Sequence, residues 1–199
     1  MAFKNTVDGA SSGFANLLSL INYSNATTIT DAQVAFAPPI ELTAGYIDAY
    51  GRNTTVVVTS VQNQGFIDDD LFNDGVTVKY RRTSVAEGVS SPVGDFSITA
   101  ATTWDQLKTS VAAANNMVLG DIALSLQGAS AGSDLIYDTY PPVGGGEGNS
   151  INADVEAVTD SYVYHQNSTM SITLNYEATD TPLHTVIPYT DLNGFIAVV

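Results

Sequence analysis

The chain has 199 residues and a formal net charge of -15, from 21 acidic residues against six basic ones. Because proteins bind nucleic-acid backbones by neutralising phosphates with Lys and Arg, this balance excludes tight binding of DNA or RNA. Cysteine is absent, which excludes disulfides, thiolate metal sites and cysteine nucleophiles.

The apolar content places the chain among folded proteins. Hydrophobic residues make up 44% of it and charged residues 14%, which is not the composition of a disordered acidic tail. No stretch approaches the roughly 20 apolar residues of a membrane-spanning helix, and the first residues contain no apolar run of signal-peptide length. We therefore expect synthesis in the cytoplasm and no membrane association.

The first part of the chain predicts one helix followed by a short strand. Ser11 and Ser12 can cap a helix whose apolar residues are spaced i, i+3, i+4 and i+7. These apolar residues are Phe14, Leu17, Leu18 and Ile21. Residues 34–36 then form a short strand, which Pro38 and Pro39 stop.

Residues 53–82 predict two neighbouring strands. Two runs rich in β-branched residues, 54–61 and 76–82, flank an acidic connection that contains Asn and Gly. In the second run Val76, Val78 and Tyr80 alternate with polar residues, so we expect these three on the core face.

The second part of the chain predicts a helix and further strands. Thr103 and Gln106 can form a reciprocal cap for a helix that ends near residues 115–116. Residues 96–100 favour a short strand before it. Alternating apolar residues predict two strands after it. They are Val118, Ile122, Leu124 and Leu126 in one strand and Met170, Ile172, Leu174 and Tyr176 in the other.

The two parts share one spacing of residues. Leu17, Asn25 and Val34 are separated by the same gaps as Leu107, Asn115 and Leu124. This predicts two related modules, each a helix followed by antiparallel strands; a chance match among common residues is the alternative. The predicted fold is α+β and mainly β, with β-sandwich-like sheets.

We expect the modules to be residues 1–88 and 89–199, joined by a small-residue connector at 83–95. Residues 140–150 are rich in Gly and predict an exposed loop. The apolar C-terminal tail predicts a strand that pairs either with its own sheet or with a neighbouring copy.

The acidic connection is the candidate metal site. Its carboxylates are hard oxygen ligands that a calcium ion prefers, although Phe72 stands where an EF-hand needs an oxygen ligand. A solvated loop is the alternative. The calcium candidates are Asp68, Asp70 and Asp74, with Asp69 and Asn73 beside them.

No catalytic site is predicted. His165 and His184 are the only histidines, and no nucleophile motif accompanies either of them. The glycine run at residues 144–148 lacks the Lys-Ser/Thr ending of a phosphate-binding loop and no helix pattern follows it. We therefore expect neither an enzyme nor a bound cofactor.

Four tyrosines have two interpretations. They can form a surface on which sugars stack, or they can line sheet faces and interfaces. These residues are Tyr137, Tyr140, Tyr162 and Tyr164.

Three segments resemble a family of virion structural proteins from large tailed bacteriophages. The segments are FANLLSLINYSNATTITDAQVAFAPP at residues 14–39, RNTTVVVTSVQNQGF at 52–66 and VTVKYRR at 76–82. The resemblance covers residues 14–82, and the second half only loosely. It implies a particle component without enzymatic residues, located in the virion.

The resemblance and the composition lead to one main hypothesis. We expect a non-enzymatic virion protein that decorates or cements the capsid, contacts the major capsid protein or tail proteins, and forms a homo-oligomer. A tail tube or baseplate protein is the alternative within that class. A receptor- or glycan-binding module is the alternative from another class.

Overall fold

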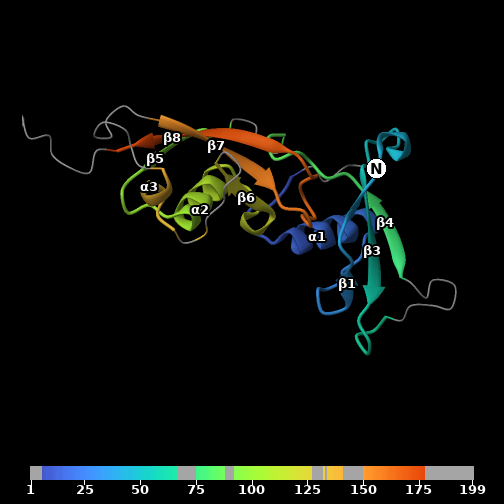
Figure 1. Ribbon diagram of the computed structural model, residues 1–199. Coiled ribbons are helices and arrows are strands. Elements are labelled where there is room, and N and C mark those ends of the chain that lie inside the picture. Colours follow the sequence, from blue (N-terminus) through green and yellow to red (C-terminus); the bar gives the residue numbers. More distant parts are fainter. Residues whose placement is uncertain are drawn as a thin grey trace, which may run out of the picture.

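A computed structural model describes residues 6–66, 75–87, 92–126, 132, 134–140 and 150–177 (Figure 1). The helices are α1 Gly13–Asn25, α2 Trp104–Ala114 and α3 Ile136–Thr139, with single 3₁₀ turns η1 Ala44–Tyr46 and η2 Leu119–Asp121. The strands are β1 Val34–Phe36, β2 Ile40–Glu41, β3 Thr54–Ser60, β4 Val76–Tyr80, β5 Asp95–Ile98, β6 Ile122–Ser125, β7 Ser150–Ala157 and β8 Thr169–Tyr176. The predicted α+β, mainly β class is confirmed.

The first sheet is built around β3. β4 pairs antiparallel with one side of β3, and β1 and β2 share the other side. Pro38 and Pro39 separate β1 from β2 because proline cannot donate to the ladder. The predicted pairing of the two β-branched runs is confirmed, with Val56 opposite Val78.

The second sheet has the order β5-β8-β7-β6. β6, β7 and β8 pair antiparallel, whereas β5 lies parallel to β8. The predicted alternation along β8 is confirmed, since all four of its apolar residues are buried and face the core.

Helices α1 and α2 begin where the sequence predicts. The hydroxyl of Ser12 accepts a hydrogen bond from Ala15 N at 3.2 Å and caps α1. Thr103 and Gln106 bond each other's backbone N–H at 3.0 and 3.2 Å and form the reciprocal cap of α2. None of the helices in the described ranges is long and apolar enough to cross a membrane.

The two sheets have separate hydrophobic clusters, and a helix packs on each. In the first cluster α1 packs on β3 and β4 through Leu17, Ile21, Val56 and Tyr80. The second cluster joins α2 and α3 to the second sheet. The layer that faces the second sheet is therefore helical, where the sequence led us to expect sandwich-like sheets.

Two details differ from the predictions. Val76 is 57% exposed, because the cluster under α1 extends only to Val78 and Tyr80. Val85, in the expected connector, is fully buried in the second cluster, and Thr83 pairs with Tyr164. The second core therefore takes in part of the chain before residue 89; the division into two domains stays a prediction.

The ends of α1 and α2 share the same hydrogen bonds. Asn25 and Asn115 each donate from the side-chain amide to the carbonyl four residues back, at 2.9 and 3.0 Å. The next residues, Ala26 and Asn116, have φ of 53° and 50°.

The residue after each of these donates to the carbonyl five residues back, as in a Schellman motif. In both halves the strand that follows the helix is an edge strand and pairs antiparallel with an inner strand of its sheet, β1 with β3 and β6 with β7. These shared features support the two-module interpretation.

Candidate interaction surface

The outer face of the first sheet is exposed. Thr54, Val56 and Tyr80 are buried on the inner face of the sheet, where Val56 and Tyr80 pack on α1, so their strand neighbours point the other way. Ile40, Thr55 and Lys79 lie side by side across β2, β3 and β4 on this outer face. Ile40 is 64% exposed, which leaves a large apolar side chain at the edge of the sheet in contact with solvent.

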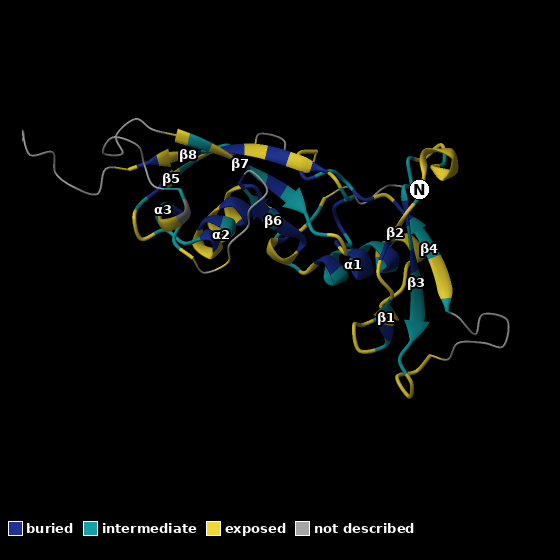
Figure 2. Cartoon of the chain, viewed as in Figure 1, coloured by how far each residue is buried: buried dark blue, intermediate teal, exposed yellow. Residues whose placement is uncertain are grey.

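The segment between β2 and β3 extends this face. Lys79 Nζ donates to the carbonyl of Tyr46 at 2.8 Å and ties the segment to β4. Tyr46 is 71% exposed, Tyr50 is 65% exposed and Ile47 is also exposed. Figure 2 shows the turn that contains them in the exposed colour.

Cations lie among these exposed rings. The guanidinium of Arg52 stands 5.2 Å from the centre of the Tyr50 ring and bonds Asp48 at 2.6 Å. Burial acts to raise the pKa of Asp48, but hydrogen bonds from Arg52 and Tyr50 outweigh it and lower the pKa. Arg81 lies in the same region and pairs with Glu87.

We call this surface the Tyr46 face. It consists of Ile40, Tyr46, Ile47, Tyr50, Arg52 and Lys79. Tyrosine and arginine are the residues that contribute most to binding at protein interfaces, and exposed apolar patches mark such sites. Two of the six basic residues of the chain, Arg52 and Lys79, belong to this face, and Arg52 is paired there with Asp48.

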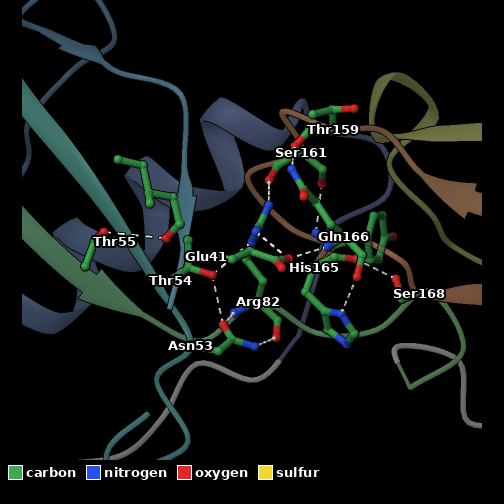
Figure 3. A network of polar contacts seen from close by, with 12 residues as sticks. Glu41, Asn53, Thr54, Thr55, Arg82, Thr159, Ser161, His165, Gln166 and Ser168 are labelled. Atoms are coloured by element: carbon green, nitrogen blue, oxygen red, sulfur yellow. Dashed lines mark hydrogen bonds and ion pairs between the residues drawn. The ribbon is translucent and has the colours of Figure 1, made fainter. Parts of the chain in front are cut away.

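Arg82 links the two halves beneath the sheet (Figure 3). Its side chain is buried and donates three hydrogen bonds: to Thr54 Oγ1 at 2.9 Å, to the Ser161 carbonyl at 2.8 Å and to Glu41 at 2.7 Å. Burial lowers the pKa of Arg82, against the opposing influence of Tyr80 and Glu41. The carboxylate of Glu41 also accepts from Gln166 N, a residue of the second half.

A second link joins the start of α1 to the second half. A Cβ atom on Gly13 would collide with the carboxylate of Asp121, so a larger residue at this position would force that side chain to shift. Asp121 lies at the positive end of the α1 dipole and accepts from Ser161 Oγ at 2.6 Å.

Aromatic packing completes the junction. Tyr162 meets the rings of Phe14 and Phe36 edge to face, and its hydroxyl donates to the Phe36 carbonyl at 3.3 Å. Together the links hold the first sheet, and with it the Tyr46 face, against the second half.

The calcium candidates Asp68, Asp70 and Asp74 lie outside the described residues. So do Asp69, Asn73, His184 and the glycine run at 144–148. Within the described ranges, no group of three or more His, Cys, Asp or Glu side chains converges on a possible metal position.

The tyrosines that the sequence assigns either to a sugar-stacking surface or to sheet faces lie inside the second half or at the junction. They are Tyr137, Tyr140, Tyr162 and Tyr164. Tyr164 is 2% exposed and its hydroxyl accepts from Val118 N at 3.3 Å. Tyr137 and Tyr140 donate to backbone carbonyls. Burial removes Tyr164 from any sugar-stacking surface, while Tyr137, Tyr140 and Tyr162 are partly exposed and use their hydroxyls in internal bonds.

The ring of His165 is 3.0 Å from the Gln166 carbonyl, and its backbone N–H donates to Thr83. The bond to Thr83 holds the connector on the second half.

The Tyr46 face was not predicted from the sequence. The available signal was two tyrosines between Gly45 and Gly51 in a loop, because loop residues lie on the surface.

Comparisons with known proteins add one relationship. No curated protein and no solved structure matches the chain. The model of a family described as "Family of unknown function (DUF7941)" matches residues 13–199, a range that includes every described helix and strand. The chain therefore belongs to the family of unknown function DUF7941.

Proposed function

We propose that the protein is a non-enzymatic structural component of a bacteriophage virion, which decorates the capsid and binds a neighbouring virion protein through the Tyr46 face. The observation that carries the proposal is this face, where Ile40, Tyr46 and Tyr50 are each at least 64% exposed on one side of a sheet. Exposed apolar patches of this kind are typical of surfaces that bind another protein.

Two further features support the proposal. Residues 14–82 resemble virion structural proteins of large tailed bacteriophages, and the Tyr46 face lies within that range. The net charge of -15 keeps a protein made in many copies soluble before assembly.

The location can be tested directly on particles produced from the genome that encodes the chain. We expect mass spectrometry of purified particles to detect the protein, and electron microscopy to place many copies at lattice-related positions on the head. Absence from the particles would overturn the proposal. Copies confined to the tail would replace the decoration role with a tail role.

The role of the Tyr46 face is tested with a double variant, Tyr46→Ala with Tyr50→Ala. Removing two exposed rings leaves both hydrophobic clusters intact, so the chain should fold. We expect its incorporation into particles to fall at least about tenfold, since aromatic side chains dominate binding energy at interfaces. The matched control is Tyr23→Ala, which removes another exposed tyrosine outside the face. Equal incorporation of both variants would contradict this role.

A further inference from the structure

Residues 42–53 join β2 to β3 and carry the two exposed tyrosines of the Tyr46 face. This segment is described in full, and apart from the single turn η1 it contains no helix or strand. A connection without regular structure keeps one shape only if other contacts offset the entropy of fixing it. The bonds within the segment therefore determine whether the tyrosine rings stand in one arrangement or in many.

Asp48 is at the centre of these bonds. Its carboxylate accepts three hydrogen bonds: from Tyr50 N at 2.9 Å, from Arg52 N at 3.2 Å and from Arg52 Nε at 2.6 Å. The backbone carbonyl of Asp48 accepts a fourth, from Gly51 N at 2.9 Å. One residue thus bonds to three of the four residues that follow it.

These bonds fold residues 48–51 into a turn. A carboxylate that accepts from the N–H two residues later closes an Asx-turn. The bond from Gly51 N to the Asp48 carbonyl closes a β-turn over the same residues. Gly51 has a φ of 70°, a left-handed conformation that glycine adopts without strain. The shape of the turn is therefore set locally by Asp48 and Gly51.

Arg52 connects the turn to the ring of Tyr50. Its guanidinium carbon lies 5.2 Å from the ring centre, which is within the reach of a cation–π contact. The bond from Nε to Asp48 keeps the guanidinium in this place, because an arginine side chain otherwise has many rotamers. The ring of Tyr50 thus has a fixed neighbour on one side, while the residue stays 65% exposed.

The first sheet holds the segment from below. Lys79, on β4, donates from Nζ to the carbonyl of Tyr46 at 2.8 Å. The side chain of Arg81, just after β4, lies against Gly51, with Cδ 3.8 Å from the place of an added Cβ atom. The turn and its rings therefore have a defined position relative to Ile40, which lies in the same row of the sheet as Lys79.

We propose that Asp48 is the positioning residue of the Tyr46 face, which fixes the turn and the Tyr50 ring in the binding arrangement before the neighbouring virion protein arrives. This inference rests on the proposed function, because it assigns Asp48 a role in binding by that face. Ordering a loop and its side chains on binding subtracts from the affinity, so a turn that is already ordered binds more tightly. Asp48 acts through Arg52 and Tyr50, and its own side chain is only 24% exposed.

Two variants at position 48 separate the bonds of this carboxylate. Asp48→Asn keeps an oxygen that accepts from Tyr50 N but removes the negative charge opposite Arg52. Asp48→Ala removes both. The matched control is Asp31→Ala, which removes an exposed carboxylate outside the face.

Neither position belongs to a hydrophobic cluster, so all three variants should fold and unfold at the urea concentration of the unaltered chain. An unchanged urea midpoint together with weaker binding separates positioning from a loss of stability. If Asp48→Ala fails to fold, as judged by circular dichroism, Asp48→Asn decides both measurements.

The first measurement is made on the purified chain alone. Nuclear magnetic resonance should show side-chain protons of Arg52 shifted upfield, because protons above an aromatic ring experience its ring current. We expect this shift to be smaller in Asp48→Asn, lost in Asp48→Ala and unchanged in Asp31→Ala. Its absence from the unaltered chain, or a full shift in both variants at position 48, would overturn the proposal.

The second measurement is incorporation into particles. We expect it to fall about two- to threefold for Asp48→Asn and at least about fivefold for Asp48→Ala, because the partner then has to order the turn. Asp31→Ala should be incorporated like the unaltered chain. Normal incorporation of both variants at position 48 would overturn the proposal.

The Tyr46→Ala, Tyr50→Ala double variant separates this proposal from the proposed function. Poor incorporation of the double variant with normal incorporation of Asp48→Ala would mean that the face binds its partner and that only the role of Asp48 is wrong. Normal incorporation of the double variant would mean that the face does not bind, and the role of Asp48 in binding would fall with it.

Discussion

At the scale of single residues, Arg82 shows how a buried charge is tolerated in this chain. Its guanidinium has three acceptors and lies under the first sheet, so the cost of removing it from water is offset only while all three are present. Removing the cation leaves the Ser161 carbonyl without this donor and the Glu41 carboxylate without its counter-ion, with only the bond from Gln166 N remaining to Glu41.

We predict that Arg82→Met lowers the free energy of unfolding by about 3 kcal/mol, the lower end of the range for a broken buried ion pair, because Glu41 is partly exposed. Urea denaturation followed by circular dichroism measures the loss. The matched control is Arg81→Met, which removes an exposed pair and should cost at most about 1 kcal/mol. Equal losses would show that the Arg82 contacts add nothing beyond a surface pair.

Tyr80 gives a prediction on pH. Burial raises the pKa of its hydroxyl above the ordinary value of 10.0, and Arg82 opposes this only in part. Above pH 10 the unfolded chain loses this proton while the folded chain keeps it, so stability falls as pH rises. The hydroxyl also has no hydrogen-bond partner among the described residues.

We therefore predict two effects of Tyr80→Phe. The stability of the variant should decline less than that of the unaltered chain between pH 8 and about pH 11. At pH 8 its free energy of unfolding should be equal or higher by about 1 kcal/mol, because a buried unpaired hydroxyl is removed. Urea denaturation at the two pH values measures both effects. Tyr46→Phe, at an exposed position, should follow the unaltered chain, and an equal decline for all three would contradict the first prediction.

At the scale of elements, substitution of alanine by glycine should have opposite effects on the free energy of unfolding at two positions. Ala26 ends α1 at a φ of 53°, a conformation that costs a non-glycine residue about 1 kcal/mol. We predict that Ala26→Gly raises the free energy of unfolding by up to about 1 kcal/mol.

The control for this prediction is Ala113→Gly, on the exposed side of α2. There glycine adds backbone entropy to the unfolded state without relieving any strain, and should cost about 0.5–1 kcal/mol. Thermal or urea unfolding of the two variants gives the comparison. Destabilisation by both would mean that the αL position of Ala26 carries no strain.

Elements with local signals could be predicted from the sequence. The hydroxyl caps of Ser12 and Thr103 and the alternation along β8 are set by residues a few positions apart, and the structure confirms all of them. The parallel pairing of β5 with β8 joins residues nearly 80 positions apart, and no pattern inside β5 specifies its neighbour. Burial of Val85 depends on the same distant contacts.

The candidate site was less predictable for a related reason. The spacing of tyrosines does not distinguish Tyr164, which is buried, from Tyr46, which is exposed. The difference arises from tertiary contacts within each half: Tyr164 bonds Val118 inside the second cluster, while Tyr46 lies in the segment tied to the outer face by Lys79. Exposure of a ring therefore follows from contacts between residues far apart in the chain.

At the scale of the whole molecule, the junction makes the halves depend on each other. Arg82, the contact of Gly13 with Asp121 and the ring of Tyr162 all cross from one sheet to the other. Each half loses buried contacts if the other unfolds. Cooperative unfolding of the two halves is the expected result.

We predict that the unaltered chain unfolds in one transition. Trp104 is the only tryptophan and is buried in the second cluster, so its fluorescence reports the second half, while circular dichroism reports both. The two urea curves should coincide. Gly13→Ala places a Cβ against the Asp121 carboxylate and should separate the curves, with circular dichroism changing first as the first half unfolds. Gly120→Ala is the matched control, because its added Cβ meets no atom within 4 Å. Separate curves for the unaltered chain would show that the halves are independent and that the junction does not couple them.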